Sequence, residues 1–246
     1  MNVLITGASS GIGKSLATYF VAEGHCVWGM ARRGEALKQL QDSLSQEKGT
    51  FRWNAGDVQK HDDIARMHDD MHKASFSPDA VYLAAGIFPN DIAPRFSFEL
   101  FSETMETNTR GALRIVDAFL DECLSRGSGH FIVLSSTAAF RPNCRGIGYP
   151  ASKAAVSIAF RGLGLAYRSR HIIFSVAYLG PVSSSMWDGK KSFFVADEQS
   201  IARKLATIIQ TRRSTYYLPF FSTFLYRTSR WIPDRWYAAI TQYIRK

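Results

Sequence analysis

The chain has 246 residues, of which 46% are hydrophobic and 21% are charged, a composition that excludes a disordered or fibrous protein and suits one α/β domain. Its three cysteines are odd in number and far apart, which excludes a disulfide framework and argues against a zinc site. The net charge of +9 is too small and too unevenly spread to indicate a nucleic-acid-binding protein without a recognition motif.

Short apolar runs alternate with longer segments of helical periodicity along most of the chain. This pattern is typical of βαβ units that build a parallel sheet. It predicts a doubly wound, mainly parallel α/β sheet with helices on both faces. The expected strands are 2–6, 26–30, 51–54, 80–84, 130–135, 173–179 and 215–218. The expected helices are 11–23, 35–45, 60–74, 99–124, 150–170 and 200–210. No linker or repeat interrupts the pattern, so residues 1–246 are expected to form a single domain.

The first turn, between the strand at 2–6 and the helix at 11–23, is rich in glycine and reads Thr-Gly-Ala-Ser-Ser-Gly-Ile-Gly. Glycines allow a tight turn and a close approach of the backbone to a pyrophosphate, and the helix N-terminus offers free N–H groups. The position of the turn therefore predicts a dinucleotide site. Its expected contacts are Gly7, Ser9, Ser10, Gly11, Ile12 and Gly13.

The end of the second strand bears on the choice of nucleotide. An acidic side chain here would bind the ribose hydroxyls of NAD, whereas a basic one is needed for the extra phosphate of NADP. The chain reads Met-Ala-Arg-Arg at 30–33 and has no acid there. A planar guanidinium suits a phosphate, so Arg32, together with Arg33, favours NADP(H). The alternative is that these arginines are only solvated charges after a strand.

A second group of polar residues lies far downstream. Tyr149 and Lys153 are four residues apart at the start of a predicted helix, so their side chains project from one face. An ammonium near a phenol favours the phenolate and lowers the pKa of the phenol into a useful range. Ser136 ends an apolar run and should stand at the carboxyl edge of the sheet, where ligands of open α/β sheets bind.

Together with Asn108-Thr109-x-Gly111, these elements resemble the classical short-chain dehydrogenase/reductase family in order and spacing, over residues 1 to about 185. The resemblance implies a Rossmann-like fold and a nicotinamide cofactor that supplies the hydride. It also implies that Tyr149 is the general acid for reduction and the base for oxidation. Ser136 would hydrogen-bond the substrate oxygen. Lys153 would bind the nicotinamide ribose and tune Tyr149, and Asn108 would hold a water in a proton relay.

The same resemblance implies further cofactor contacts beyond the first turn. An Asp-Val pair after the third strand approaches the adenine in family members, although the acid is also suited to cap the next helix. The family's Asn-Asn-Ala-Gly is here Leu-Ala-Ala-Gly at 83–86, and its Pro-Gly-x-Val-x-Thr is Leu-Gly-Pro-Val-Ser-Ser at 179–184. The residues expected to contact the cofactor are Asp57, Val58, Ala85, Gly86, Tyr149, Lys153, Val182 and Ser184.

The C-terminal residues depart from the alternating pattern. Between residues 200 and 246 there are nine basic residues and a single acid, Asp234. Residues 219–246 contain two short amphipathic stretches on either side of Pro233, both too short to span a bilayer. Two interpretations stay open. The aromatic stripes complete the core or a subunit interface, or they lie on a membrane surface with their cationic flanks against it.

These observations predict an NADP(H)-dependent oxidoreductase that interconverts a carbonyl and an alcohol on a fairly apolar, lipid-like substrate. A lid lined with apolar side chains is expected to suit such a substrate. The residues expected to form this lid are Met186, Trp187, Phe193 and Phe194. The alternative is a non-catalytic NADP(H)-binding regulatory or membrane-peripheral scaffold protein. By analogy with the family, we expect a homodimer or homotetramer through the two long helices. No metal or nucleic acid is expected. The cysteine use and the lack of room for a signal sequence favour a cytoplasmic protein, or one peripheral on the inner face of a membrane.

Overall fold

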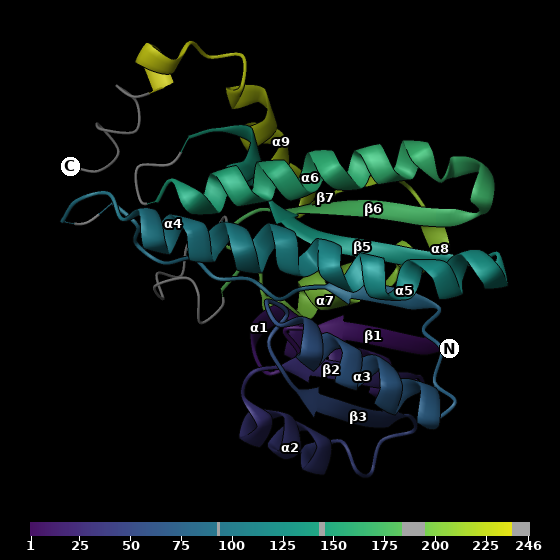
Figure 1. Ribbon diagram of the computed structural model, residues 1–246. Helices are drawn as coiled ribbons and strands as arrows, with labels where there is room; N and C mark the ends of the chain where they lie inside the picture. Colours follow the sequence, from purple (N-terminus) through teal and green to yellow (C-terminus); the bar gives the residue numbers. More distant parts are fainter. Residues whose placement is uncertain (93, 143–145, 184–194, 238–246) are drawn as a thin grey trace.

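The computed structural model describes residues 1–92, 94–142, 146–183 and 195–237. In these residues, one parallel sheet of seven strands has the order β3-β2-β1-β4-β5-β6-β7 (Figure 1). Its strands are β1 (Asn2–Thr6), β2 (Cys26–Ala31), β3 (Thr50–Ala55), β4 (Ala80–Leu83), β5 (Gly129–Ser136), β6 (Ile172–Leu179) and β7 (Thr215–Leu218). The order reverses between β1 and β4, and in open α/β sheets such a switch point creates a binding crevice at the carboxyl edge.

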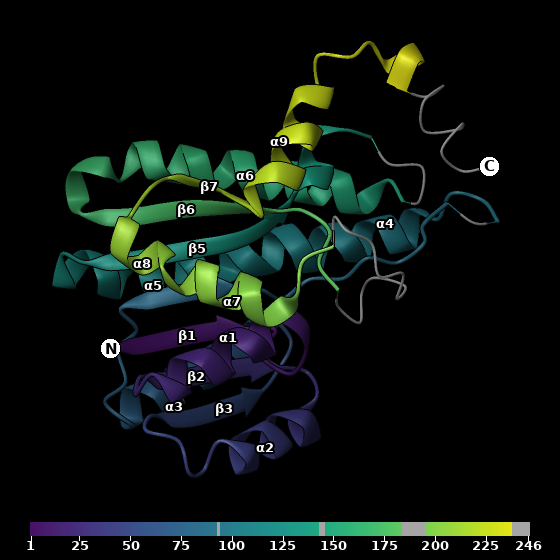
Figure 2. The ribbon, with the colours of Figure 1, turned by 180° about the vertical axis from the view of Figure 1, so that it is seen from behind.

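Helices cover both faces of this sheet. Those of the described residues are α1 (Gly11–Ala22), α2 (Gly34–Ser43), α3 (His61–Lys73), α4 (Phe98–Met105), α5 (Ala112–Arg126), α6 (Gly148–Ala166), α7 (Glu198–Ala206), α8 (Ile208–Thr211) and α9 (Phe220–Ser229). Helices α3, α5 and α6 lie on the face seen in Figure 1, whereas α1, α2, α7 and α8 lie on the face seen in Figure 2. The predicted doubly wound α/β fold class is therefore confirmed.

The central strands are mostly apolar because both of their faces are buried. In β1, Val3 and Ile5 point into the core beneath α1, while Leu4 points into the core beneath α3 and α5, and all three side chains have no exposed surface. Burying such a side chain stabilises the fold by roughly 1.5–3 kcal/mol. Side chains of β1 that point alternately to the two faces of the sheet thus pack against the helices on both sides.

The long helix expected at 99–124 is not uniform. It begins as α4, passes through a π-helical turn at Glu106–Gly111 and continues as α5. A π-turn shifts the hydrogen-bond ladder by one residue and is frequent at functional sites. Here the π-turn contains Asn108, one of the expected site residues. Similarly, the helix expected at 200–210 is divided into α7 and α8, with Asp197 capping the first through a bond from the Ser200 N–H (3.0 Å).

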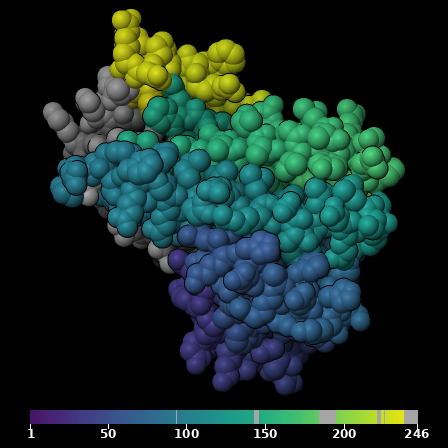
Figure 3. All heavy atoms as spheres, in the orientation of Figure 1, coloured from purple at the N-terminus to yellow at the C-terminus, as the bar shows by residue number. Residues whose placement is uncertain are grey.

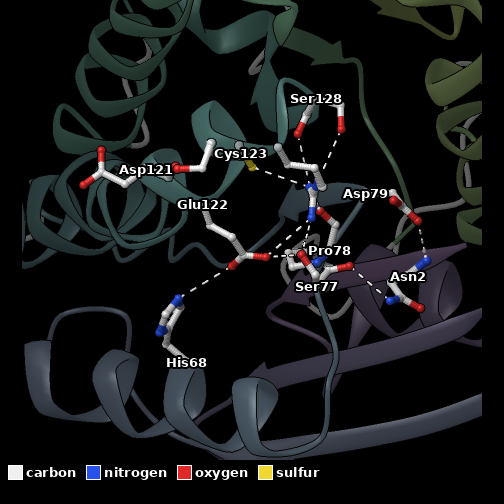
Figure 4. A network of polar contacts seen from close by, with 11 residues as sticks. Asn2, His68, Ser77, Pro78, Asp79, Asp121, Glu122, Cys123 and Ser128 are labelled. Carbon is white, nitrogen blue, oxygen red and sulfur yellow. Dashed lines mark hydrogen bonds and ion pairs between the residues drawn. The ribbon is translucent and has the colours of Figure 1, made fainter.

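The amino edge of the sheet, opposite the crevice, is held by a polar network (Figure 4). Asp79 accepts a bond from the Asn2 N–H (2.8 Å), which ties the start of β1 to the start of β4. The Arg126 guanidinium donates to the carbonyl oxygens of Pro78 (2.7 Å) and Ser128 (3.2 Å). These bonds fix the end of α5 and the starts of β1 and β4 relative to one another.

Residues 219–237, which follow β7, lie at the carboxyl edge of the sheet (Figure 2). Helix α9 contacts β7 and the short 3-10 helix at Thr137–Phe140. Thr223 has no exposed surface, and its hydroxyl donates to the Pro219 carbonyl (2.8 Å) within the first turn of α9. Among the described helices, none has the length and hydrophobicity that crossing a bilayer requires.

Candidate active site

One cavity of about 650 Å³ opens at the carboxyl edge of the sheet. It runs from the β1–α1 turn past the ends of β4 and β5 to the C-terminal residues. Most of the residues expected to form the site line it: Gly7, Ser9, Ser10, Gly11, Ile12, Gly13, Arg32, Arg33, Asp57, Val58, Ala85, Gly86, Ser136, Tyr149, Lys153 and Val182. Asn108 lies behind the wall. Ser184 and the expected lid residues Met186, Trp187, Phe193 and Phe194 lie outside the described residues.

The glycine-rich turn is built around close backbone contacts. Gly7 has a φ of +73°, and a Cβ atom there would lie 2.8 Å from the Ala85 nitrogen. A Cβ atom on Gly13 would lie 2.3 Å from the Gly7 carbonyl oxygen. Ser10, which precedes α1, makes no side-chain cap, so the first N–H groups of the helix face the cavity without a capping side chain. This cradle fits a pyrophosphate, because its N–H groups and the positive end of the helix dipole favour an anion.

Two arginines stand at the end of β2. Arg33 donates to the Ser9 hydroxyl from Nε (3.3 Å) and Nη2 (3.1 Å), and Arg32 Nη1 lies 4.0 Å from Asp57 Oδ2. Asp57 does not cap α3. Its Oδ1 accepts from the Gln59 N–H (3.0 Å) and closes a tight turn before the helix. Two guanidinium groups and a hydroxyl thus meet at one end of the cavity, a combination suited to a phosphate.

Ser136, Tyr149 and Lys153 meet in the middle of the cavity. Ser136 ends β5, and its Oγ accepts from the Ala138 N–H (3.1 Å). The Lys153 Nζ donates to the Leu134 carbonyl (2.8 Å) and lies 5.7 Å from the centre of the Tyr149 ring. Phe88 packs against that ring, with 4.6 Å between the ring centres. The tyrosine is therefore held between an aromatic side chain and the two expected partners.

The sequence predicts that Lys153 lowers the pKa of Tyr149, but in the structure the pKa of Tyr149 is raised. Burial raises the pKa of Tyr149, and its hydrogen bond with Ser136 opposes that rise. Burial also lowers the pKa of Lys153 to about 8. The Lys153 ammonium is directed at the Leu134 carbonyl, and the hydrogen bond from Ser136 is a contact that favours the phenolate.

Asn108 is buried behind the cavity. Its amide exchanges two bonds with the Ile87 backbone, accepting from the N–H (2.8 Å) and donating to the carbonyl (2.9 Å), and it donates to the Ser152 hydroxyl (3.0 Å). A Cβ atom on Gly86 would lie 3.2 Å from Asn108 Oδ1 and 3.5 Å from Lys153 Nζ. Asn108 therefore ties the loop after β4 to α6, close to the lysine.

The geometry agrees with the comparison to known proteins. Residues 1–193 match the family model described as short chain dehydrogenase. The chain belongs to the short-chain dehydrogenase/reductase family.

An uncharacterized oxidoreductase of Listeria monocytogenes is 31% identical to this short-chain dehydrogenase/reductase over 154 residues, 63% of this chain and 62% of that protein. The NADP-dependent 3-hydroxy acid dehydrogenase of Salmonella typhi is 33% identical over 160 residues, again 63% of this chain and 62% of that enzyme. The chain thus spans less than two thirds of the length of these relatives. A short-chain dehydrogenase of Sphingobium yanoikuyae in complex with NADPH has a TM-score of 0.81 at 21% identity, covering 100% of this chain and 95% of that one, a likeness that shows the fold.

Sequence reasoning missed Asp91, which orients the helix that carries Tyr149. Asp91 is 1% exposed, and its carboxylate accepts from the N–H groups of Ile147 (2.7 Å) and Gly148 (2.6 Å) at the start of α6. The negative charge also complements the positive end of the helix dipole. Asp91 lies 56 residues before Ile147 in a loop without periodicity, so no local pattern connects the two.

Several residues outside the expected site of this short-chain dehydrogenase/reductase also line the cavity, among them Arg141, Tyr226 and Tyr237. Arg141 follows the 3-10 helix after β5, and Tyr226 and Tyr237 come from the C-terminal residues. The interpretation that the C-terminal stretch packs on the protein therefore applies to these side chains. The second amphipathic stretch extends into residues 238–246, which lie outside the described part of the chain.

Proposed function

We propose that this chain is an NADP(H)-dependent oxidoreductase that interconverts a carbonyl and an alcohol on a fairly apolar substrate, with Tyr149 as the general acid and base. The observation that carries this proposal is the meeting of Ser136, Tyr149 and Lys153 in the cavity that also contains the glycine-rich cradle. The name of the Salmonella relative and the NADPH in the Sphingobium neighbour support the same cofactor class.

In the direction of reduction, the chemistry that a nicotinamide would supply when bound in the cradle is a hydride for the carbonyl carbon. The Ser136 hydroxyl holds the substrate oxygen, and the Tyr149 hydroxyl gives its proton to that oxygen as negative charge develops. The Lys153 ammonium, 5.7 Å from the Tyr149 ring centre, stabilises the phenolate that remains and binds the ribose. Asn108 Oδ1, which accepts one bond from the Ile87 N–H, would accept another from a water near Lys153 Nζ, from which the proton on Tyr149 would be replaced. Oxidation of an alcohol follows the same steps in reverse.

Loss of the Tyr149 hydroxyl tests the enzymatic assignment. NADPH consumption is followed at 340 nm with a panel of apolar ketones, for wild type and for Tyr149→Phe. We expect Tyr149→Phe to abolish turnover, because no other group stands at the same position to supply the proton, while NADPH still binds. An unchanged rate in this variant would refute the mechanism. Nucleotide binding without turnover by the wild type would favour the alternative of a non-catalytic NADP(H)-binding protein.

Preference for NADP(H) over NAD(H) is supported by the contacts of Arg32 and Arg33 at the end of β2. We expect Arg32→Asp to weaken NADPH binding by about ten- to a hundred-fold, since a bond to a charged group contributes about 1.5–3 kcal/mol. NADH binding should not weaken. Titration by tryptophan quenching measures both, and Arg52→Asp, an exposed charge change on β3, serves as the control. Equal losses for the two nucleotides would contradict the phosphate assignment.

Peripheral membrane contact is a second proposal, supported by apolar side chains of the C-terminal residues that face outwards. Phe220 is 73% exposed, Trp231 85% and Trp236 57%. Figure 3 shows this segment, in yellow, standing out from the body of the molecule. Exposed aromatics beside basic residues favour an anionic lipid surface. We expect flotation with phosphatidylserine vesicles to be reduced in a Trp231→Ser, Trp236→Ser double variant and retained in Phe98→Ser, which removes a 73% exposed aromatic side chain from α4. Equal flotation of all three proteins would remove this proposal.

A homodimer or homotetramer is proposed through α5 and α6. It is supported by Ile158 and Leu165, which lie seven residues apart on α6 and are 64% and 76% exposed. Such side chains cost solubility unless a partner covers them. Light scattering after gel filtration should give an oligomeric mass for the wild type and a lower mass for Leu165→Glu. A monomeric wild-type protein would contradict the proposal.

A further inference from the structure

The cavity is lined at one end by the C-terminal segment, here defined as residues 219–237. Its first anchor is aromatic. The Phe140 ring packs against Tyr178 (4.6 Å between ring centres), and the Tyr178 and Tyr217 rings stack at 5.4 Å. The Arg227 guanidinium of α9 lies 5.0 Å from the centre of the Tyr217 ring. Helix α9 is thus fixed beside β7 and the 3-10 helix that follows Ser136.

The second anchor is Arg141. Its side chain is 9% exposed, and its Nη1 lies 2.6 Å from Asp234 Oδ1. Its Nη2 donates to the Ile232 carbonyl oxygen, and its guanidinium carbon lies 4.5 Å from the centre of the Tyr237 ring. One buried cation therefore contacts a carboxylate, a backbone carbonyl and an aromatic face of the same segment. Asp234 is also the single acid among residues 200–246.

Arg141 is joined directly to the catalytic end. The short 3-10 helix at Thr137–Phe140 begins after Ser136, whose hydroxyl caps it, and ends at Arg141. A single rigid turn therefore separates the group that would hold the substrate oxygen from the group that holds the C-terminal segment. Tyr226 and Tyr237 of this segment line the same cavity as Ser136 and Tyr149.

We propose that Arg141 and Asp234 form a latch that holds the C-terminal segment over the active site, so that Tyr226 and Tyr237 determine which substrates fit. Arg141 is a positioning residue in this arrangement. The tyrosine rings set the length of the pocket beyond the reacting carbon, and their faces suit an aromatic or aliphatic ketone substituent. The specificity part of this inference rests on the proposed carbonyl reduction, whereas the latch does not.

Amide hydrogen exchange tests the latch without any turnover. Asp234→Lys replaces the attraction to Arg141 by repulsion. We expect the amides of residues 230–237 to exchange at least several-fold faster in this variant, because the segment opens locally. NADPH affinity should stay unchanged. Asp121→Lys, the same charge change at an exposed position on α5, serves as the control. Equal exchange in wild type and Asp234→Lys would overturn the latch.

Kinetics with acetophenone and the bulkier benzophenone test the specificity. Removing either ring lengthens the pocket, so Tyr237→Ala and Tyr226→Ala should raise the ratio of kcat/KM for benzophenone over acetophenone by about ten-fold. Trp236→Ala is the matched control, since its side chain is 57% exposed and is not among the residues that line the cavity. Unchanged ratios in both tyrosine variants would overturn the specificity role. A wild-type protein that binds NADPH but reduces neither ketone, nor any of the wider panel, would refute the proposed function instead, and the exchange result would still decide the latch.

Discussion

His130, in the second position of β5, makes folding stability sensitive to mild acid. Its side chain is 4% exposed, and its Nε2 lies 2.7 Å from the Ser175 hydroxyl. Ser175 gives its own proton to the Arg213 carbonyl oxygen (2.6 Å), so the imidazole must donate from Nε2. Nδ1 is then the unprotonated nitrogen, and among the described residues it has no hydrogen-bond partner. A second proton would have to be placed on this buried, unpartnered atom.

The magnitude follows from the pKa. Burial, assisted by the charge of Arg212, lowers the pKa of His130 from 6.5 to about 4. Below pH 6.5 the unfolded chain binds a proton that the folded protein refuses until about pH 4, so stability falls as the pH falls through this window. Each pKa unit corresponds to about 1.4 kcal/mol, which gives a loss of about 2.5 kcal/mol between pH 7 and pH 4.5.

A neutral replacement isolates this term from the titration of the carboxylates. His130→Gln keeps an N–H donor for Ser175 and cannot be protonated. The free energy of unfolding is measured by urea denaturation at pH 7 and pH 4.5 for wild type, His130→Gln and the exposed control His72→Gln. We expect the loss on acidification to be about 2.5 kcal/mol smaller in His130→Gln than in the other two proteins. The same acid dependence in all three would refute the reasoning.

Three further predictions follow from contacts around the site. Asp91→Asn removes the negative charge that accepts from the N–H groups at the start of α6. We expect kcat to fall by roughly ten-fold, while the NADPH affinity measured by fluorescence titration stays unchanged. An equal loss in kcat and in affinity would indicate a structural role only. Gly111→Ala places a Cβ atom 2.6 Å from Val58 Cγ2 and should lower the free energy of unfolding, measured by urea denaturation, by about 1–3 kcal/mol. Adding Val58→Ala should partly relieve this loss. A Gly111→Ala protein as stable as wild type would contradict the prediction. Because burial lowers the pKa of Lys153 to about 8, the rate of ketone reduction should fall as the pH rises through about 8; a rate that stays constant to pH 10 would oppose a role for its charge.

The strands were predicted within about one residue because most of them are apolar runs bounded by polar residues, as expected for strands buried on both faces of a sheet. The π-turn at Glu106–Gly111 was not predicted. A one-residue shift in the backbone ladder leaves the apolar periodicity of the long helix almost unchanged, so the sequence gives no sign of it.

The two ends of the cavity also differ in how far their residues could be predicted from the sequence. Tyr149 and Lys153 are four residues apart on one helix, and Gly7 and Gly13 belong to one turn, so local spacing already brings each pair together. Arg141 and Asp234 are 93 residues apart, and their pairing depends on the path of the chain through α6, β6 and β7. The charge of an arginine does not indicate which acidic residue it pairs with. The pairing of Arg141 with Asp234 depends on the fold, which brings both side chains to the same edge of the sheet.

The residues proposed to select the substrate and the residues proposed to transfer the proton lie in different parts of the chain. The family match ends at residue 193, and the groups that would move the proton, Ser136, Tyr149 and Lys153, lie within it. The C-terminal segment lies wholly beyond it and meets the matched part at the cavity through Arg141, Tyr226 and Tyr237. Ser136, Tyr149 and Lys153 lie on β5 and α6, so substitutions at Tyr226 and Tyr237 would leave the proposed proton-transfer groups in place. Under the proposed latch, relatives with the same central residues can therefore differ in substrate, and the residues to compare among them are those after β7.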